Sequence, residues 1–249
     1  MATDPNVLAR GGAPRPKVKR VYKSVGVDEK DGTFRVLLDG KPVMTPLRVA
    51  LSTRQRALAD AVAAEWDAQV PDIDPETMPL TRLVSTALDK VTPQRDMLIG
   101  ELMKYADADL LCYLAGHPAD LKARQGAIWQ PVLDWMDATH GVKLSTITGI
   151  MPHGQTPETH AALRRAIAAL DDERLTAFQA AAAVTNSLAL SLAFTQDWIT
   201  SEETFAAASL DETYQMEQWG EDDLALGRRR HIKADLLAIG EYLRLLKLA

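Results

Sequence analysis

From Lys19 onward the chain alternates apolar and polar positions, as a strand with one buried face does. Asp31-Gly32 separates two such runs, and Asp39-Gly40 follows the second. Asp-Gly between alternating runs is a strong hairpin signal, because glycine accepts a positive φ without steric cost. Residues 41–51 continue as short extended pieces whose prolines fit an edge of a sheet. The pattern predicts a small antiparallel sheet.

From Ser52 the hydrophobic period becomes that of a helix. Leu58, Val62 and Trp66 recur every four residues and share one helix face, and Ser52 with Gln55 has the spacing of a capping box. After the proline-containing segment 71–79, a second apolar stripe is formed by Leu80, Leu83, Val84, Ala87 and Leu88. The two predicted helices can cover the apolar face of the sheet.

Nearly everything after Thr92-Pro93 has helical periodicity. This dipeptide reads as an N-cap followed by the first helical residue, so we place a domain boundary between Asp89 and Thr92. We expect helices over residues 93–116, 121–141 with a break at Pro131, 157–170, 173–195, 200–219 and 223–246. The helix over 173–195 is apolar on nearly every side, which predicts a central position in a bundle. Thr200 with Glu203 forms a second predicted capping box.

The predicted fold class is therefore α+β. Residues 1–16 form a basic flexible tail, and residues 17–91 form a small antiparallel-sheet domain with covering helices. Residues 92–249 form a larger all-α bundle domain.

Composition narrows the possible functions. The chain has 249 residues, 47% of them hydrophobic, and its 34 acidic against 28 basic side chains give a net charge of −6. It therefore lacks the positive field that drives non-specific nucleic-acid binding. The most apolar run, Ala177–Phe194, is interrupted by polar residues, so we expect no membrane insertion. Cys112 is the single cysteine, which suits a reducing compartment.

No known catalytic or cofactor motif stands out. Glycine-rich phosphate loops, a serine nucleophile elbow and a Cys-His signature are all missing from the sequence. Its five histidines are scattered without metal-ligand spacing. We therefore predict no catalytic residue, cofactor or metal. Carboxylates are abundant, and a carboxylate-based hydrolase with its site between the two domains is the enzymatic alternative.

Acidic residues gather near the C-terminus. Nine of them lie between Asp197 and Asp223 with no lysine or arginine among them. A solvated helix face explains Glu202 and Glu203, which the helix dipole favours at an N-terminus, but not the acids at the far end. A binding surface is the other interpretation, and Trp219 supports it because tryptophan is enriched at interface hot spots.

Five motifs occur in a fixed order along the chain. They are Asp39-Gly-Lys-Pro-x-x-Thr-Pro, Ala64-Glu-Trp-Asp-x-Gln, Met78-Pro-Leu-Thr-x-Leu, Asp109-Leu-Leu-Cys-Tyr and Asp211-Glu-x-x-Gln-x-x-x-Trp-Gly. Together, over residues 20–246, they resemble the assembly chaperones of the α subunit of the ATP synthase catalytic head. One departure is Trp129-Gln130-Pro131, where the family is expected to have Trp-Asp-Pro.

The resemblance implies a non-enzymatic assembly factor with an N-terminal α+β domain and a C-terminal orthogonal helix bundle. Such a chaperone binds the unassembled α subunit, masks its β-binding surface and is displaced by β. The chain shows no convincing transit segment, so we expect the bacterial cytoplasm, or the mitochondrial matrix if the source is eukaryotic. A free monomer is expected, and a scaffold for an unrelated client is the third possibility.

We expect two client-binding elements. The first is the C-terminal acidic segment, whose candidate residues are Glu212, Glu217, Trp219, Glu221 and Asp222. The second is Trp66, whose helical spacing also fits a purely structural role in packing the helix on the sheet.

Overall fold

The computed structural model describes residues 18–149, 151 and 153–248. The predicted basic tail, residues 1–16, lies outside them. The described chain divides into two compact units, and the first runs up to Pro93 and also includes the C-terminal residues from Glu241. The second unit consists of Gln94–Gly240.

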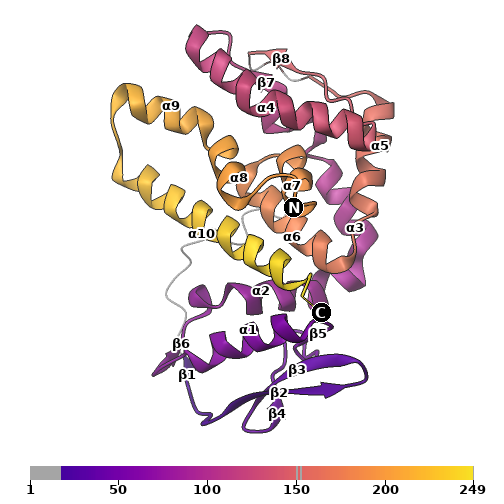
Figure 1. Ribbon diagram of the computed structural model, residues 1–249, viewed down its shortest axis with the longest axis vertical. Helices are drawn as coiled ribbons and strands as arrows, with labels where there is room; N and C mark the ends of the chain where they lie inside the picture. The colour runs from indigo at the N-terminus through magenta and orange to yellow at the C-terminus, as the bar shows by residue number, and fades with distance from the viewer. Residues whose placement is uncertain (1–17, 150, 152, 249) are drawn as a thin grey trace. The chain divides into compact units, whose positions relative to one another are not determined.

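A small antiparallel sheet is the centre of the first unit (Figure 1). Strands β2 (Val25–Lys30) and β3 (Thr33–Leu38) pair in a register that runs from Val25 opposite Leu38 to Lys30 opposite Thr33. Their turn places Asp31 and Gly32 at φ values of 53° and 74°, so the predicted hairpin is confirmed. Strands β4 (Lys41–Pro42) and β5 (Ser52–Thr53) pair with the other edge of β3. A separate ladder joins β1 (Val18–Lys19) to β6 (Asp72–Ile73).

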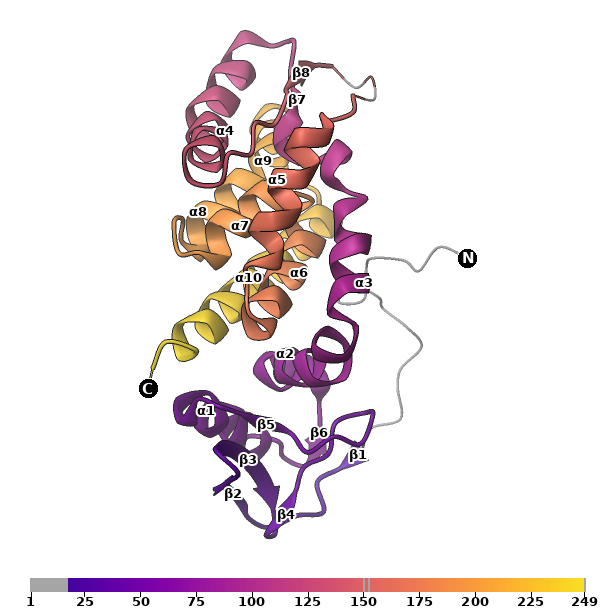
Figure 2. The ribbon, with the colours of Figure 1, turned by 90° about the vertical axis from the view of Figure 1, so that its right-hand side faces the viewer.

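Helix α1 (Arg56–Asp67) packs on β2 and β3 (Figure 2). Its predicted buried face is confirmed, because Leu58 and Val62 are fully buried. The predicted capping box at its start is wrong. Ser52 pairs with Arg35 in the sheet, so it is not available as an N-cap, and Gln55 takes that position without a side-chain hydrogen bond.

The prediction that a new helix begins at Thr92-Pro93 is wrong. Helix α2 (Pro79–Thr86) continues directly into a π-helical turn, η2 (Ala87–Val91), and then into α3 (Thr92–Met103). Thr92 is itself helical, and the chain kinks at Gln94. A wider π turn just before Pro93 relieves the clash of a proline ring with the preceding turn, so the proline bends the helix without ending it.

Beyond Met103 the predicted helix to residue 116 is wrong. The chain forms two short 3₁₀ turns, η3 (Ala106–Ala108) and η4 (Leu110–Cys112), and then β7 (Tyr113–Leu114), which pairs in parallel with β8 (Ile147–Thr148). Asp109 causes the break. Its backbone is extended and its buried carboxylate accepts hydrogen bonds from the Leu111 and Ala189 N–H groups and from Ser187 Oγ.

Helix α4 (Ala119–His140) is unbroken, so the predicted interruption at Pro131 is wrong. Proline removes one hydrogen bond, but the buried side chains Trp129, Val132, Leu133 and Met136 hold the helix on both sides of it. Gly141 ends α4 at a φ of 65°. Helix α5 (Pro157–Ala168) begins at Pro157, as predicted, and the Thr156 hydroxyl accepts a hydrogen bond from the Thr159 N–H group as its N-cap.

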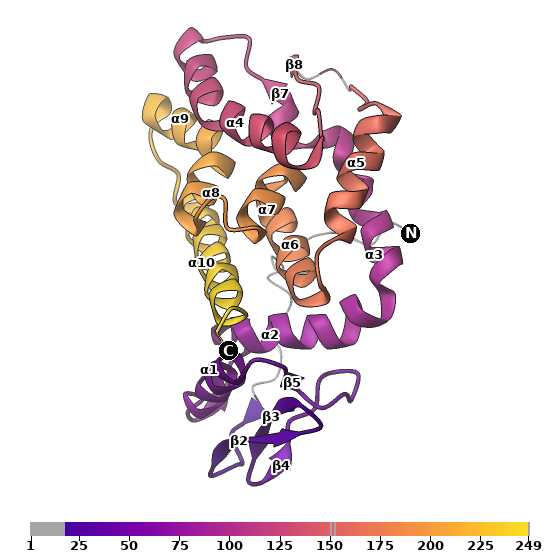
Figure 3. The same cartoon turned by 45° about the vertical axis from the view of Figure 1, so that its right-hand side comes forward.

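The predicted central helix is present as two helices. Helix α6 (Asp172–Thr185) ends at Asn186, which has a φ of 55°, and Ser187 caps α7 (Leu188–Thr195). Every residue of α7 is buried, and it packs against α4, α6 and α8 (Ser201–Ala208), as Figure 3 shows. The predicted central position is therefore confirmed, although the left-handed Asn186 was not predicted.

The last two helices carry the acidic segment. The predicted capping box of Thr200 and Glu203 begins α8, and Ser209 separates that helix from α9 (Leu210–Trp219). Gly220, at a φ of 91°, ends α9, and α10 (Asp223–Leu245) follows. Among the described helices, none has the length and hydropathy needed to cross a lipid bilayer.

The buried Asp109 makes a testable contribution to stability. Asp109→Ala leaves two buried N–H groups and a hydroxyl without an acceptor, so we expect the free energy of unfolding to fall by about 3 kcal/mol or more. Urea denaturation followed by circular dichroism measures this. As a control, Asp96→Ala at an exposed position should change it by less than about 0.5 kcal/mol. Equal effects of the two variants would contradict the role of Asp109.

Asp39 makes the stability of the first unit depend on pH. Its carboxylate accepts hydrogen bonds from the Ser24 and Lys23 N–H groups, and these bonds hold the pKa of Asp39 below its usual value. A depressed folded-state pKa stabilises the fold above the unfolded pKa of about 4, and this contribution is lost as the pH falls through the folded pKa. Asp39→Asn should therefore unfold more easily than wild type at pH 7, and the difference should shrink in acid. A difference that does not change with pH would contradict this expectation.

Candidate functional site

Two of the sequence motifs meet at the start of α2 and hold that helix in place. Glu65 accepts hydrogen bonds from the N–H groups of Leu80 and Thr81, both at 2.8 Å, and from the Thr81 hydroxyl at 2.7 Å. Burial raises the pKa of Glu65. The buried Gln69 likewise accepts from the Asp74 N–H group at 2.7 Å. These polar motif residues therefore satisfy backbone donors within the first unit.

The motif around Cys112 is structural as well. Asp109 fixes the loop described above, and Cys112 is buried next to it. Burial raises the pKa of the Cys112 thiol to about 12, so it stays protonated at neutral pH and is a poor nucleophile.

Tertiary structure supplies the positive charges that the acidic segment lacks in sequence. Glu217 forms an ion pair with Arg124 of α4 at 2.5 Å. Glu212 pairs with Arg228 and, at 3.4 Å, with Arg229, both from α10. The predicted site residues Glu212 and Glu217 are thus partly neutralised within the second unit, which sequence proximity could not show.

The other predicted residues of this segment are exposed where α9 turns into α10. Trp219 is 78% exposed, and Glu221 and Asp222 lie at the surface in the connection. Asp222 also accepts a hydrogen bond from the Ala225 N–H group at 3.3 Å, at the start of α10. Leu224, which sequence reasoning missed, is 85% exposed. We call Trp219, Glu221, Asp222 and Leu224 the α9–α10 corner.

A signal for Leu224 was present in the sequence. The buried residues of α10 in the second unit include Leu236 and Ile239, which lie on one stripe of the helix. Leu224 precedes Leu236 by 12 residues and Ile239 by 15, so at about 100° per residue it lies roughly 120° from the first and roughly 60° from the second, at the edge of that stripe. An apolar residue at the edge of the buried stripe, next to an acidic run, is a candidate contact residue, and its exposure in the structure is what distinguishes it from the buried set.

Trp66 belongs to the first unit and not to the corner. Its ring contacts the Tyr22 ring edge-on, with 6.0 Å between centroids, and its carbonyl oxygen accepts a hydrogen bond from the Tyr22 hydroxyl at 2.6 Å. The side chain is half-buried. These contacts fit the packing role that its helical spacing also suggested.

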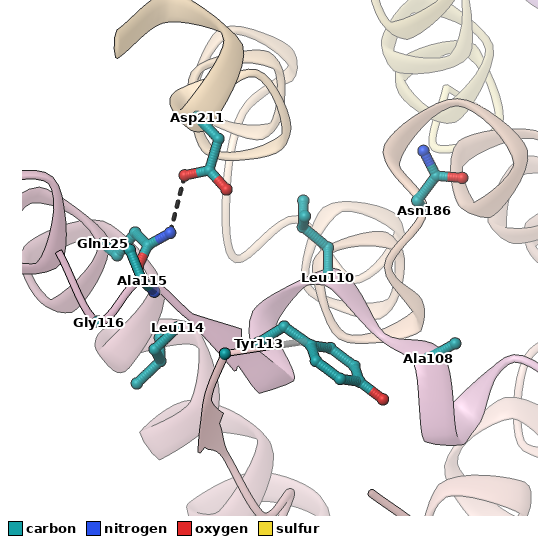
Figure 4. Close-up of a pocket in the computed structure, with 10 residues that line it drawn as sticks. Ala108, Leu110, Tyr113, Leu114, Ala115, Gly116, Gln125, Asn186 and Asp211 are labelled. Carbon is teal, nitrogen blue, oxygen red and sulfur yellow. Dashed lines mark hydrogen bonds between the residues drawn. The ribbon is translucent and has the colours of Figure 1, made fainter. Parts of the chain in front are cut away.

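An open pocket of about 500 Å³ lies in the second unit (Figure 4). Leu110, Tyr113 and Leu114 supply apolar walls, and Asp211 accepts a hydrogen bond from the buried Gln125 at its edge. Asp211 is the one carboxylate among the described lining residues. Hydrolysis by paired carboxylates needs two, so the pocket does not supply the catalytic pair of the enzymatic alternative. The described residues also contain no group of three or more potential metal ligands.

Comparisons with known proteins agree with this picture. Residues 19–137 match the family described as ATP12 chaperone protein. The crystal structure of Atp12 from Paracoccus denitrificans has a TM-score of 0.86 and 34% sequence identity, over 92% of this chain and 99% of that chain. A point mutant of the same Paracoccus protein gives the same score and identity, over 92% of this chain and 98% of that chain.

Two further relatives come from different organisms. The Atu1473 protein of Agrobacterium tumefaciens has a TM-score of 0.87 and 39% identity, over 94% of this chain and 88% of that chain. The mitochondrial protein atp12 of Schizosaccharomyces pombe is 27% identical in an alignment of 220 residues that covers 83% of this chain and 75% of that protein.

The comparisons define the class of protein, which is an assembly chaperone. The chain belongs to the ATP12 chaperone family, the ATP synthase assembly factors that its motifs resemble. The α+β fold class is likewise confirmed.

The two tryptophans should respond differently to truncation. Trp219→Ala should change the free energy of unfolding by less than about 0.5 kcal/mol, because its side chain is largely in water. Trp66→Ala should lower it by about 3 kcal/mol, because packing against Tyr22 is lost. Thermal and urea denaturation of both variants measure the contrast. A large loss for Trp219→Ala would show that the corner is part of the core.

Proposed function

We propose that this chain is an assembly chaperone that binds the unassembled α subunit of the ATP synthase catalytic head. It masks the surface that the β subunit later occupies, and β displaces it. Membership of the ATP12 chaperone family supports the general role. The main observation in support of this client-binding site is that Trp219 is exposed. The acids of the same motif, Asp211 and Glu212, instead bind Gln125 and Arg228 of this chain.

The corner has the composition that a releasable contact needs. An unassembled subunit exposes an obligate interface, which is apolar and prone to aggregation. Trp219 and Leu224 offer apolar area to such a surface, and the carboxylates of Glu221 and Asp222 attract positive charge at its rim. A contact made by these four residues buries only a small area, so the client can be released when another subunit competes for the same surface.

The remaining candidate residues have smaller proposed roles. Glu212 and Glu217 flank the corner, and their arginine partners reduce the charge that they present. We expect them to affect client binding less than Glu221 and Asp222. Trp66 acts through the stability of the first unit.

We further propose that the free chain is a monomer that acts in the bacterial cytoplasm, or in the mitochondrial matrix in a eukaryote. The three similar structures come from two bacteria and one relative is mitochondrial by name, which supports both settings. The mass of the purified chain in solution tests the first part.

Co-expression with the α subunit alone tests the proposed function. We expect a soluble complex with α, and we expect added β to release this chain from it. Neither outcome follows for a scaffold of an unrelated client. Absence of any complex between the wild-type chain and α would overturn the proposal.

The corner is tested in the same assay by a double charge reversal, Glu221→Lys with Asp222→Lys, and separately by Trp219→Ala. Each should raise the Kd for α by about tenfold or more, because hot-spot contacts are lost. Glu29→Lys, at an exposed acid of β2, is the matched control and should leave the Kd within about twofold. Circular dichroism checks that each variant is folded. Unchanged binding by folded corner variants would remove the corner from the site.

A further inference from the structure

The connection between β4 and β5 presents apolar side chains to solvent. It folds back on itself through a bridge between Met44 and Ala50, and we call residues 43–51 the β4–β5 hairpin. Met44, Leu47 and Val49 are 52%, 65% and 42% exposed. Three exposed large apolar residues within six positions are unusual for a short surface turn, where polar residues normally predominate.

The hairpin is held in one conformation by a buried carboxylate. Asp89, in η2, is 8% exposed, and it accepts hydrogen bonds from Thr45 Oγ1 at 2.6 Å and from the Leu47 N–H group at 3.0 Å. Thr45 Oγ1 in turn accepts from the Val49 N–H group at 3.1 Å. Burying a carboxylate is costly, and here its hydrogen bonds go to the tip of an exposed turn. The turn is therefore preorganised.

The tip also contains backbone strain. Arg48 has a φ of 64°, which residues other than glycine and asparagine rarely adopt, and its N–H group donates to the Thr45 carbonyl at 2.8 Å. Strained residues persist where the surrounding contacts over-determine them, and they gather at binding and active sites. The left-handed backbone at Arg48 makes the tight turn at the end of the hairpin, where Leu47 and Arg48 are both exposed.

All ionisable side chains of this stretch of sequence are positive. Between Asp39 and Asp60 the chain has Lys41, Arg48, Arg54 and Arg56 and no acidic residue. Arg56 forms an ion pair with Asp60 at 2.9 Å, whereas Lys41, Arg48 and Arg54 are exposed and supply the positive charge. The Asp89 carboxylate beneath the tip is already engaged with Thr45 and Leu47. A complementary surface is therefore apolar at its centre and carries carboxylates at its rim.

We propose that the β4–β5 hairpin is a second client-binding element, which packs Met44, Leu47 and Val49 on an apolar patch bordered by carboxylates on the unassembled α subunit. The inference rests on the proposed function and deepens it. A preorganised apolar tip binds with little loss of conformational entropy, so a small contact can contribute substantially. Its positive rim is opposite in sign to the acidic α9–α10 corner, so the two elements select different regions of the client.

Binding of purified variants to the α subunit tests this element. Leu47→Asp should raise the Kd by about tenfold or more, because it places a charge in the centre of the contact. Val21→Asp, at an exposed valine of the same unit outside the hairpin, is the matched control and should stay within about twofold. Arg48→Asn keeps a residue that tolerates a positive φ and removes the charge, so the dependence of the Kd on salt concentration should become weaker.

The outcomes separate this inference from the proposed function. If wild type does not bind α, both fail. If wild type binds α and folded Leu47→Asp binds equally well, the hairpin element alone is overturned. Two parallel measurements cover other occupants of the hairpin. Loss of a dimer in Leu47→Asp with unchanged α binding would assign the hairpin to a second copy of this chain. Loss of binding to phosphatidylserine-containing vesicles with unchanged α binding would assign it to a lipid surface.

Discussion

Backbone N–H groups that have no partner within their own helix or strand are the constraint on which this structure depends. Three carboxylates satisfy them at places where the chain changes direction. Glu65 receives the first N–H groups of α2, Asp109 receives those of η4 and α7, and Asp89 holds the turn between β4 and β5. Each acid connects segments that are distant in sequence, so each fixes tertiary structure rather than a single helix.

This constraint explains why most of the motif residues lie outside the proposed client-binding surface. Their acids and amides are directed inward, where a buried polar group must be paired. The corner tryptophan is an exception, since Trp219 is exposed and has no such structural task. Occurrence in a motif does not show whether a residue serves folding or binding. An aromatic side chain that is exposed, in a motif whose polar residues have hydrogen-bond partners inside the chain, is the better indicator of binding.

The two proposed binding elements suit a chaperone that must release its client. One is apolar and acidic, the other is apolar and basic, and each presents only a few side chains. Charged rims favour rapid association and a defined orientation, whereas small apolar centres limit the affinity. A subunit that buries a larger, obligate interface can then displace the chaperone without any chemical energy source.

Local patterns in the sequence determined the α+β class, the two Asp-Gly turns, the buried stripe of α1, the capping box at Thr200 and the central helix region. They did so because periodicity and turn chemistry depend on neighbouring residues. Tertiary structure alone decided the break at Asp109, the continuity of α4 through Pro131, and the neutralisation of Glu212 and Glu217 by arginines from other helices. In each of these cases the deciding partner is remote in sequence, so no local pattern could contain it.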